Sequence, residues 1–122
     1  MRRAALALLM GALATSALAE PPVRTPEQRQ VLIDLARVLG QAHALHRVCA
    51  GPADDTWRAR MGRLLEVEAP SETLKAKLTE SFNTGFASKE AQAKDCKAAT
   101  VAEQAVAQKG AALSRRLAAP AP

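Results

Sequence analysis

An apolar stripe with helical spacing is the feature that most constrains the fold of this chain. Apolar residues recur every three or four positions over residues 31–49, which places them on one face of a helix of about six turns. Thr25 can cap this helix, Pro26 suits its first position, and Gln28 completes a capping box. Gly51–Pro52 ends it. The stripe consists of Val31, Leu32, Leu35, Val38, Leu39, Ala42, Leu45, Val48 and Cys49.

Two further helices are predicted after this break. Asp54–Thr56 offer caps for a second helix, and Ala69–Pro70 ends it. Its apolar face consists of Trp57, Met61, Leu64 and Leu65. Ser71 begins a third helix, whose apolar side chains, four residues apart, are Leu74, Leu78 and Phe82. Asn83–Gly85 is then either its end or a local irregularity, because glycine readily adopts the left-handed conformation.

Ser88 is expected to cap a fourth helix that runs to about Ala118. Its seam alternates spacings of three and four residues, which is typical of a helix packed lengthwise on a partner. The seam consists of Cys96, Ala99, Glu103, Val106, Gly110, Leu113 and Leu117. No segment alternates apolar and polar residues for long enough to form a strand, and aromatic residues make up only 2% of the chain. The predicted fold class is therefore all-α, a small bundle of about four helices.

The N-terminal segment has the features of a secretory signal peptide. Arg2 and Arg3 form a basic start, residues 4–13 are an uncharged apolar run, and Ala17 and Ala19 predict cleavage after Ala19. A buried N-terminal helix is the alternative. A transmembrane anchor is less well supported, because the run is too short and no second span follows. The sequence thus predicts residues 1–19 as a signal peptide that is removed, and a periplasmic location.

The rest of the chain is predicted to be one domain. Residues 20–25 form an extended leader, residues 26–118 the helical domain, and residues 119–122 a disordered Ala/Pro tail. Removal of the two signal arginines leaves 15 basic residues against 12 acidic ones, a modest charge of +3. The basic residues are spread along the chain, whereas nucleic-acid binders usually gather them on one face. Nucleic acid is therefore not an expected partner.

The two cysteines are expected to form one disulfide. Cys49 lies at the end of the first helix and Cys96 near the start of the fourth, and an exported protein with two separated cysteines usually joins them. Two buried thiols or a redox-active pair are the alternatives, but neither cysteine is part of a Cys-x-x-Cys motif at a helix start.

A disulfide here would set how the two long helices pack. Because it holds the end of the first helix beside the start of the fourth, the two are expected to lie antiparallel. Leu35 and Leu39 would then face the fourth helix. The residues that they contact there are predicted to be Val106 and Gly110. Glu103 is expected to lean to the edge of this seam and pair with an arginine or lysine, because burial of an unpaired charge costs several kcal/mol.

Two histidines raise the possibility of a metal site. His43 and His46 lie one helical turn apart and could both touch one metal ion, with Cys49 or Met61 completing a soft copper site. However, the disulfide would occupy Cys49, and no acidic ligand or third histidine is adjacent. Helix-surface or capping histidines are the plainer interpretation. No metal or other cofactor is predicted.

Arg47, Trp57 and Arg58 are the candidate binding residues. They could form an anion-binding corner near the Cys49 end of the first helix. The alternative is a tryptophan packed in a helix junction beside solvated arginines. No catalytic arrangement stands out: no Ser-His-Asp or Cys-His set has a suggestive context, no glycine-rich phosphate loop is present, and Glu66 and Glu68 lie on different helix faces.

A series of short motifs along residues 30–117 carries a family resemblance. In order, they are Leu39–Gly40, His43, Leu45, Arg47, Cys49, Trp57–Arg58, Met61, Leu64–Leu65, Glu68–Pro70, Phe82–Asn83, Gly85–Phe86, Cys96, Gly110–Ala111 and Leu113. The set resembles a family of small, exported, functionally uncharacterised alpha-proteobacterial proteins with two well-separated cysteines. The resemblance implies export and a disulfide, and it implies no activity.

The sequence therefore favours a periplasmic, disulfide-stabilised helical protein without catalytic activity that serves as a binding or envelope-accessory module. The alternative is a periplasmic metal-binding protein that uses His43 and His46. A small cell-wall hydrolase is a third and weaker reading. The partner is not identified, although another envelope protein is the expected kind, and no transmembrane anchor is expected in the mature chain.

Overall fold

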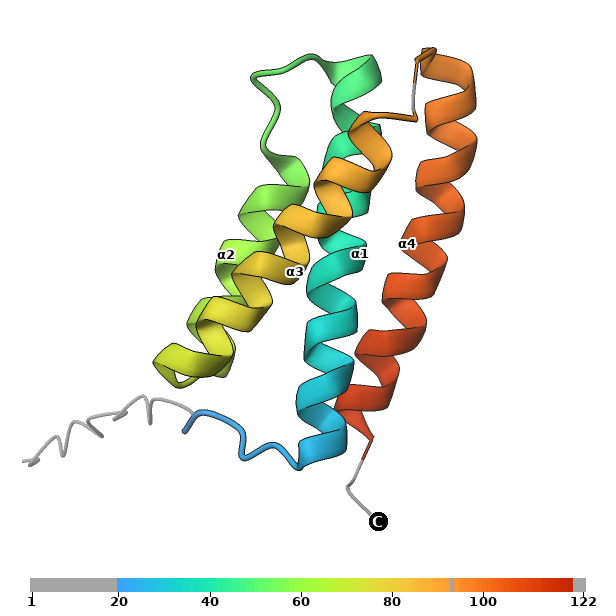
Figure 1. The fold of residues 1–122 in the computed structure, drawn as a ribbon. Helices are drawn as coiled ribbons and strands as arrows, with labels where there is room; N and C mark the ends of the chain where they lie inside the picture. Colours follow the sequence, from blue (N-terminus) through green and yellow to red (C-terminus); the bar gives the residue numbers. More distant parts are fainter. Residues whose placement is uncertain (1–19, 93, 120–122) are drawn as a thin grey trace, which may run out of the picture.

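The computed structural model describes residues 20–92 and 94–119, and this part of the chain folds into four helices without a strand. They are α1 (Pro26–Ala50), α2 (Thr56–Glu68), α3 (Glu72–Glu90) and α4 (Cys96–Ala118) (Figure 1). The all-α prediction is confirmed. The predicted signal peptide, residues 1–19, and residues 120–122 of the predicted tail lie outside the described residues. No helix in the described ranges is long and apolar enough to span a bilayer.

The central element is α1, against which the other three helices pack. Figure 1 shows α4 on one side of it and α2 and α3 on the other. Its start has the predicted capping box: the Gln28 amide donates to Thr25 Oγ1 over 3.1 Å, and the Thr25 amide donates to Gln28 Oε1 over 3.0 Å. Gly51 ends it with φ of 97°, a conformation that favours glycine.

α1 and α4 lie antiparallel, as predicted (Figure 1). A disulfide between Cys49 and Cys96 joins the end of α1 to the start of α4. Gly110 is buried on this contact, where a methyl group on it would lie 3.1 Å from Val38 Cγ1 and 3.9 Å from Leu35 Cδ1. The predicted proximity of Leu35 to Gly110 is therefore present. Val38, which was not predicted to face Gly110, lies closer to it than Leu35 does.

The predicted boundary between the third and fourth helices is wrong. Asn83–Gly85 neither ends nor distorts α3, which continues to Glu90, and the Ser88 hydroxyl donates to the Gly85 carbonyl inside this helix. The cap of α4 is Asp95, whose carboxylate accepts from the Ala98 amide over 2.9 Å. Gly85 stays helical because α3 presses against α1 there: a methyl group on Gly85 would overlap the Arg37 carbonyl.

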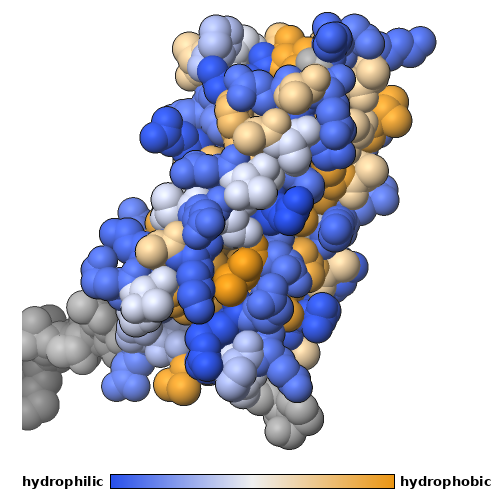
Figure 2. Space-filling model, in the orientation of Figure 1, coloured by the Kyte–Doolittle hydropathy of each residue, from blue (hydrophilic) through white to orange (hydrophobic). Residues whose placement is uncertain are grey.

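Aliphatic side chains fill the core, as the composition requires. The buried residues of α1 meet Met61 of α2, Leu78 and Phe82 of α3, and Leu113 and Leu117 of α4. Hydrophilic side chains cover most of the face on which α3 lies (Figure 2). The core is therefore organised around α1, and the spaces left between the outer helices are where binding sites can form.

The leader before α1 closes one end of the bundle. Arg24 donates from Nε and Nη2 to the Glu68 carboxylate over 3.0 and 2.6 Å, and from Nη1 to the Leu117 carbonyl over 3.0 Å. The Glu68 side chain is only 5% exposed. Arg24 therefore connects the end of α2 to the end of α4, a link that the sequence did not predict because its members lie 44 and 93 residues apart.

Candidate functional site

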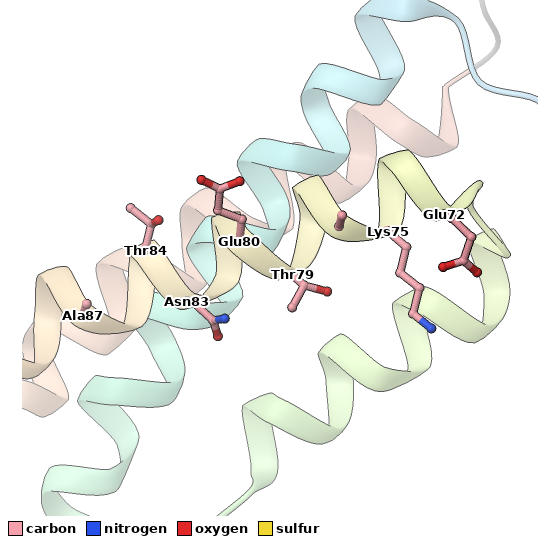
Figure 3. A pocket seen from close by; sticks show the side chains of 8 residues that line it. Glu72, Lys75, Thr79, Glu80, Asn83, Thr84 and Ala87 are labelled. Atoms are coloured by element: carbon pink, nitrogen blue, oxygen red, sulfur yellow. The ribbon is translucent and has the colours of Figure 1, made fainter.

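A hollow of about 700 Å³ lies along the surface of α3 and does not have the form of a binding site. All of its lining residues lie between Glu72 and Ala87 of this one helix. Figure 3 shows their side chains spread apart, with Glu80 and Thr84 on one side and Thr79 and Asn83 on the other. One helix face cannot enclose a ligand, so this hollow is open surface.

A second hollow of about 450 Å³ is lined by residues of α1, α2 and α3, and we call it the three-helix pocket. Its volume lies within the usual range of ligand pockets, roughly 300–1,000 Å³. Its walls are mostly apolar, with a few polar and basic groups. The lining residues are His43, Arg47, Arg58, Met61, Gly62, Leu65, Thr79, Phe82, Asn83 and Phe86.

His43 is the most deeply buried polar residue of this pocket. It is only 6% exposed, and its ring centroid lies 5.8 Å from that of Phe82 and 5.3 Å from that of Phe86. Its Nδ1 atom is buried without a hydrogen-bond partner among the described residues. Burial lowers the pKa of His43, and the charges of Arg47 and Arg58 lower it further, against a smaller opposing effect of Asp54 and Asp55. The imidazole is therefore neutral at pH 7.

Two arginines bring positive charge to the same pocket. The Arg47 guanidinium lies over the Phe86 ring, with Cζ 5.4 Å from the centroid, and its Nε is buried without a partner among the described residues. Arg58 approaches from the exposed first turn of α2. Within residues 20–92 and 94–119, no carboxylate forms an ion pair with either arginine. Their charges are thus available to an anion.

Gly62 keeps part of the pocket open. It lies in the middle of α2, where glycine costs roughly 0.5–1 kcal/mol relative to alanine. A methyl group placed on it would meet no atom within 4 Å. Packing within the chain therefore does not require glycine at this position, whereas a larger side chain would project into free space at the edge of the pocket.

The structure brings Arg47 and Arg58 together but places Trp57 on another face. Trp57 is not among the pocket residues; its Nε1 donates to Glu103 Oε2 over 3.3 Å, and the Arg60 guanidinium lies 4.2 Å from its ring centroid. Of the predicted anion-binding corner, Arg47 and Arg58 therefore line the pocket and Trp57 does not. His43 lines the pocket with the two arginines. Residues four apart share a helix face, so the spacing of His43 and Arg47 is the signal that could have found this pair.

The two histidines do not share a site. His43 lies against the α3 aromatic rings, whereas His46 Nδ1 lies 3.0 Å from Glu103 Oε1 of α4 and His46 Nε2 lies 3.5 Å from Asp54 Oδ1. No group of three or more metal-ligating His, Cys, Asp or Glu side chains converges within the described ranges. The prediction that Glu103 pairs with an arginine or lysine is wrong. The antiparallel register of α1 and α4 instead places His46 and Trp57 beside Glu103.

Comparison with known proteins gives one match. Residues 27–120 match the model of a family described as Protein of unknown function (DUF2385). No curated protein matches the chain, and no solved structure matches it. The matched region spans nearly all of the four helices, so it contains the disulfide and the complete three-helix pocket.

Proposed function

The chain belongs to the DUF2385 family, whose description assigns no function, and from that premise we propose that it binds a small organic anion in the three-helix pocket. The observation that carries this proposal is the pair of buried atoms without partners, His43 Nδ1 and Arg47 Nε, on side chains that line one pocket. A buried polar atom without a partner costs about 1–3 kcal/mol, and a bound anion would give Arg47 the acceptor that the chain does not supply.

The lining defines the chemistry of the ligand. Two guanidinium groups favour a carboxylate or phosphate, to which arginine donates paired hydrogen bonds. The neutral imidazole of His43 adds one donor and one acceptor. Met61, Phe82 and Phe86 present apolar surface, which requires an apolar body on the ligand. The expected ligand is therefore a compact carboxylate or phosphate with an aromatic or branched apolar body.

Binding without catalysis is the activity that these residues support. Among the described residues that line the pocket there is neither a carboxylate nor a cysteine, and Thr79 is the one hydroxyl. A nucleophile needs a general base beside it, and the one imidazole of the pocket, His43, packs against two phenyl rings. We propose a binding protein that works in the periplasm after removal of its signal peptide. The disulfide supports an oxidising compartment.

Titration with phenylacetate tests this function. We expect isothermal titration calorimetry of the mature chain to show saturable binding to phenylacetate and not to phenylethanol, which has a similar body without the charge. Arg58→Ser removes a guanidinium, and Gly62→Leu fills free space, so either variant should weaken binding at least tenfold. Arg63→Ser is the matched control, because Arg63 is exposed on the same helix and does not line the pocket.

Two results would contradict the proposal. One is equal binding of phenylacetate and phenylethanol, since the arginines would then contribute nothing. The other is equal weakening by Arg58→Ser and Arg63→Ser, which would assign the effect to net charge and not to the pocket. Circular dichroism of each variant shows whether the helices remain folded.

A further inference from the structure

A separate groove of about 460 Å³ lies between α2 and α4, and we call it the α2–α4 groove. Leu35, Val38 and Leu39 of α1 contribute to it between the two outer helices. It shares no lining residue with the three-helix pocket, because the two sites lie on different faces of α2. The α2 wall consists of Trp57, Arg60, Arg63, Leu64 and Val67, and the α4 wall of Ala107, Gly110, Ala111 and Ser114.

The groove arises because α2 and α4 each pack against α1 and not extensively against each other. The α4 wall carries only small side chains, which do not reach across to Leu64 and Val67. Apolar surface therefore remains open to water along this side of the bundle, and Val67 is 58% exposed. Exposed apolar surface of this kind is typical of an interaction site.

The charged groups of the groove lie on one wall. The Ser114 hydroxyl is already used, since it donates to the Gly110 carbonyl over 2.9 Å. The charged groups are Arg60 and Arg63, both on α2, and no carboxylate lines the groove among the described residues. The α4 wall and the α1 residues thus offer no free side-chain hydrogen-bond donor, while the α2 wall offers positive charge. These features complement an apolar chain that carries one negative group.

The groove has the size of a small-molecule site. The α2 wall from Trp57 to Val67 is about 15 Å long at the helical rise. The groove volume of about 460 Å³ lies within the usual range of ligand pockets, roughly 300–1,000 Å³. The groove is therefore long enough and large enough for a single acyl chain.

From this combination of apolar lining, positive charge on one wall and elongated form, we propose that the α2–α4 groove binds a free fatty acid of medium chain length. The acyl chain lies along Leu64 and Val67 against the small residues of α4, and the carboxylate lies at Arg60 and Arg63. This site is independent of the anion-binding function proposed for the three-helix pocket, because the two have separate linings.

The fluorescence of Trp57 gives a direct test, because it is the single tryptophan of the chain and lines the groove. The mature protein is titrated with octanoate, nonanoate and decanoate below their micelle concentrations. We expect a saturable spectral change and a Kd that falls about fourfold with each added methylene, which corresponds to about 0.8 kcal/mol per buried CH₂. Decanol, without the charge, should bind more weakly than decanoate.

Two neighbouring alanines of α4 provide a matched pair of variants. Ala111 lines the groove and Ala112 does not, and both are exposed, so a glutamate at either position leaves the core intact. Ala111→Glu should weaken decanoate binding at least tenfold, whereas Ala112→Glu should leave it unchanged. Val67→Gln, on the opposite wall, gives a second variant at an exposed position. Gly62→Leu in the three-helix pocket should not alter decanoate binding.

Any one of three results would overturn the proposal. A spectral change without saturation, a Kd independent of chain length, or equal effects of Ala111→Glu and Ala112→Glu would show that decanoate does not occupy the groove. Vesicles of phosphatidylcholine with phosphatidylglycerol are the comparison for a membrane surface. Binding to these vesicles without binding to free decanoate would replace the fatty acid site by a membrane-docking surface.

Discussion

Gly40 of α1 and Gly85 of α3 form a reciprocal contact, in which each glycine lies against the backbone of the other helix. A methyl group on Gly40 would overlap the Phe82 carbonyl, and one on Gly85 would overlap the Arg37 carbonyl. Two glycines therefore set how closely the two helices approach, and through that distance they place Phe82 and Phe86 against His43.

Alanine at either position of this contact should destabilise the protein. The obstructing atoms are backbone atoms, which cannot move aside without separating the helices, so we expect Gly40→Ala and Gly85→Ala each to cost about 2–3 kcal/mol of the free energy of unfolding. Gly62→Ala is the control, because it has free space and should stabilise α2 by roughly 0.5–1 kcal/mol. Urea denaturation measures all three. A gain in stability from Gly85→Ala would contradict the close approach.

Removal of the disulfide should lower stability by about 4 kcal/mol in the chain-entropy model, because Cys49 and Cys96 lie 47 residues apart. Both cysteines are exposed, so the double variant Cys49→Ser/Cys96→Ser buries no new hydroxyl. Denaturation of the variant and the oxidised protein gives the difference. Alkylation of the unfolded, unreduced protein should label no thiol, and mass spectrometry that finds a labelled cysteine would contradict the bond.

Loss of Arg24 should also be costly, because it leaves the Glu68 carboxylate buried without its partner. Removal of one member of a buried ion pair typically costs about 3–5 kcal/mol, and Arg24→Met is expected near the lower value because Arg24 remains 17% exposed. Arg24→Met/Glu68→Leu should recover most of the loss, because no charge then remains buried. A double-mutant cycle measures this coupling, and additive effects of the two changes would show that the pair does not interact.

The lowered pKa of His43 makes stability depend on pH. The unfolded chain binds a proton at His43 near pH 6.5, whereas the folded chain binds it only at lower pH. The contribution of His43 to the free energy of unfolding should therefore be constant above about pH 6.5 and fall as the pH decreases, by at most about 1.4 kcal/mol per pH unit. The difference between the wild type and His43→Gln isolates this effect. If the wild type instead became more stable relative to His43→Gln as the pH decreases, this prediction would be contradicted.

Substitution of Gly110 tests the contact between α1 and α4. Leucine there would meet Val38 at once, so Gly110→Leu should destabilise by about 1–3 kcal/mol despite the better helix propensity of leucine. Alanine is a milder change, because Val38 Cγ1, which would lie 3.1 Å away, is part of a side chain that can move by a few tenths of an ångström. Thermal unfolding compares the variants, and a gain in stability with leucine would mean that Gly110 faces solvent.

The sequence alone determined those features that depend on interactions within a few residues. The start of α1 at the Thr25–Gln28 capping box and the start of α3 at Ser71 follow from hydrogen bonds across three residues. The apolar stripe of α1 follows from the helical repeat. The disulfide was predictable as well, because a chain with two cysteines has a single possible intramolecular pairing.

The tertiary structure decided everything that depends on the rotation and register of one helix against another. Gly85 looks like a helix end in the sequence, but the backbone of α1 requires a residue without a side chain inside a continuous α3. His43 and His46 lie three residues apart, yet one contacts α3 and the other α4. A local pattern specifies which face of a helix is apolar, whereas the side chains that meet across helices are fixed only when the other three helices pack around α1.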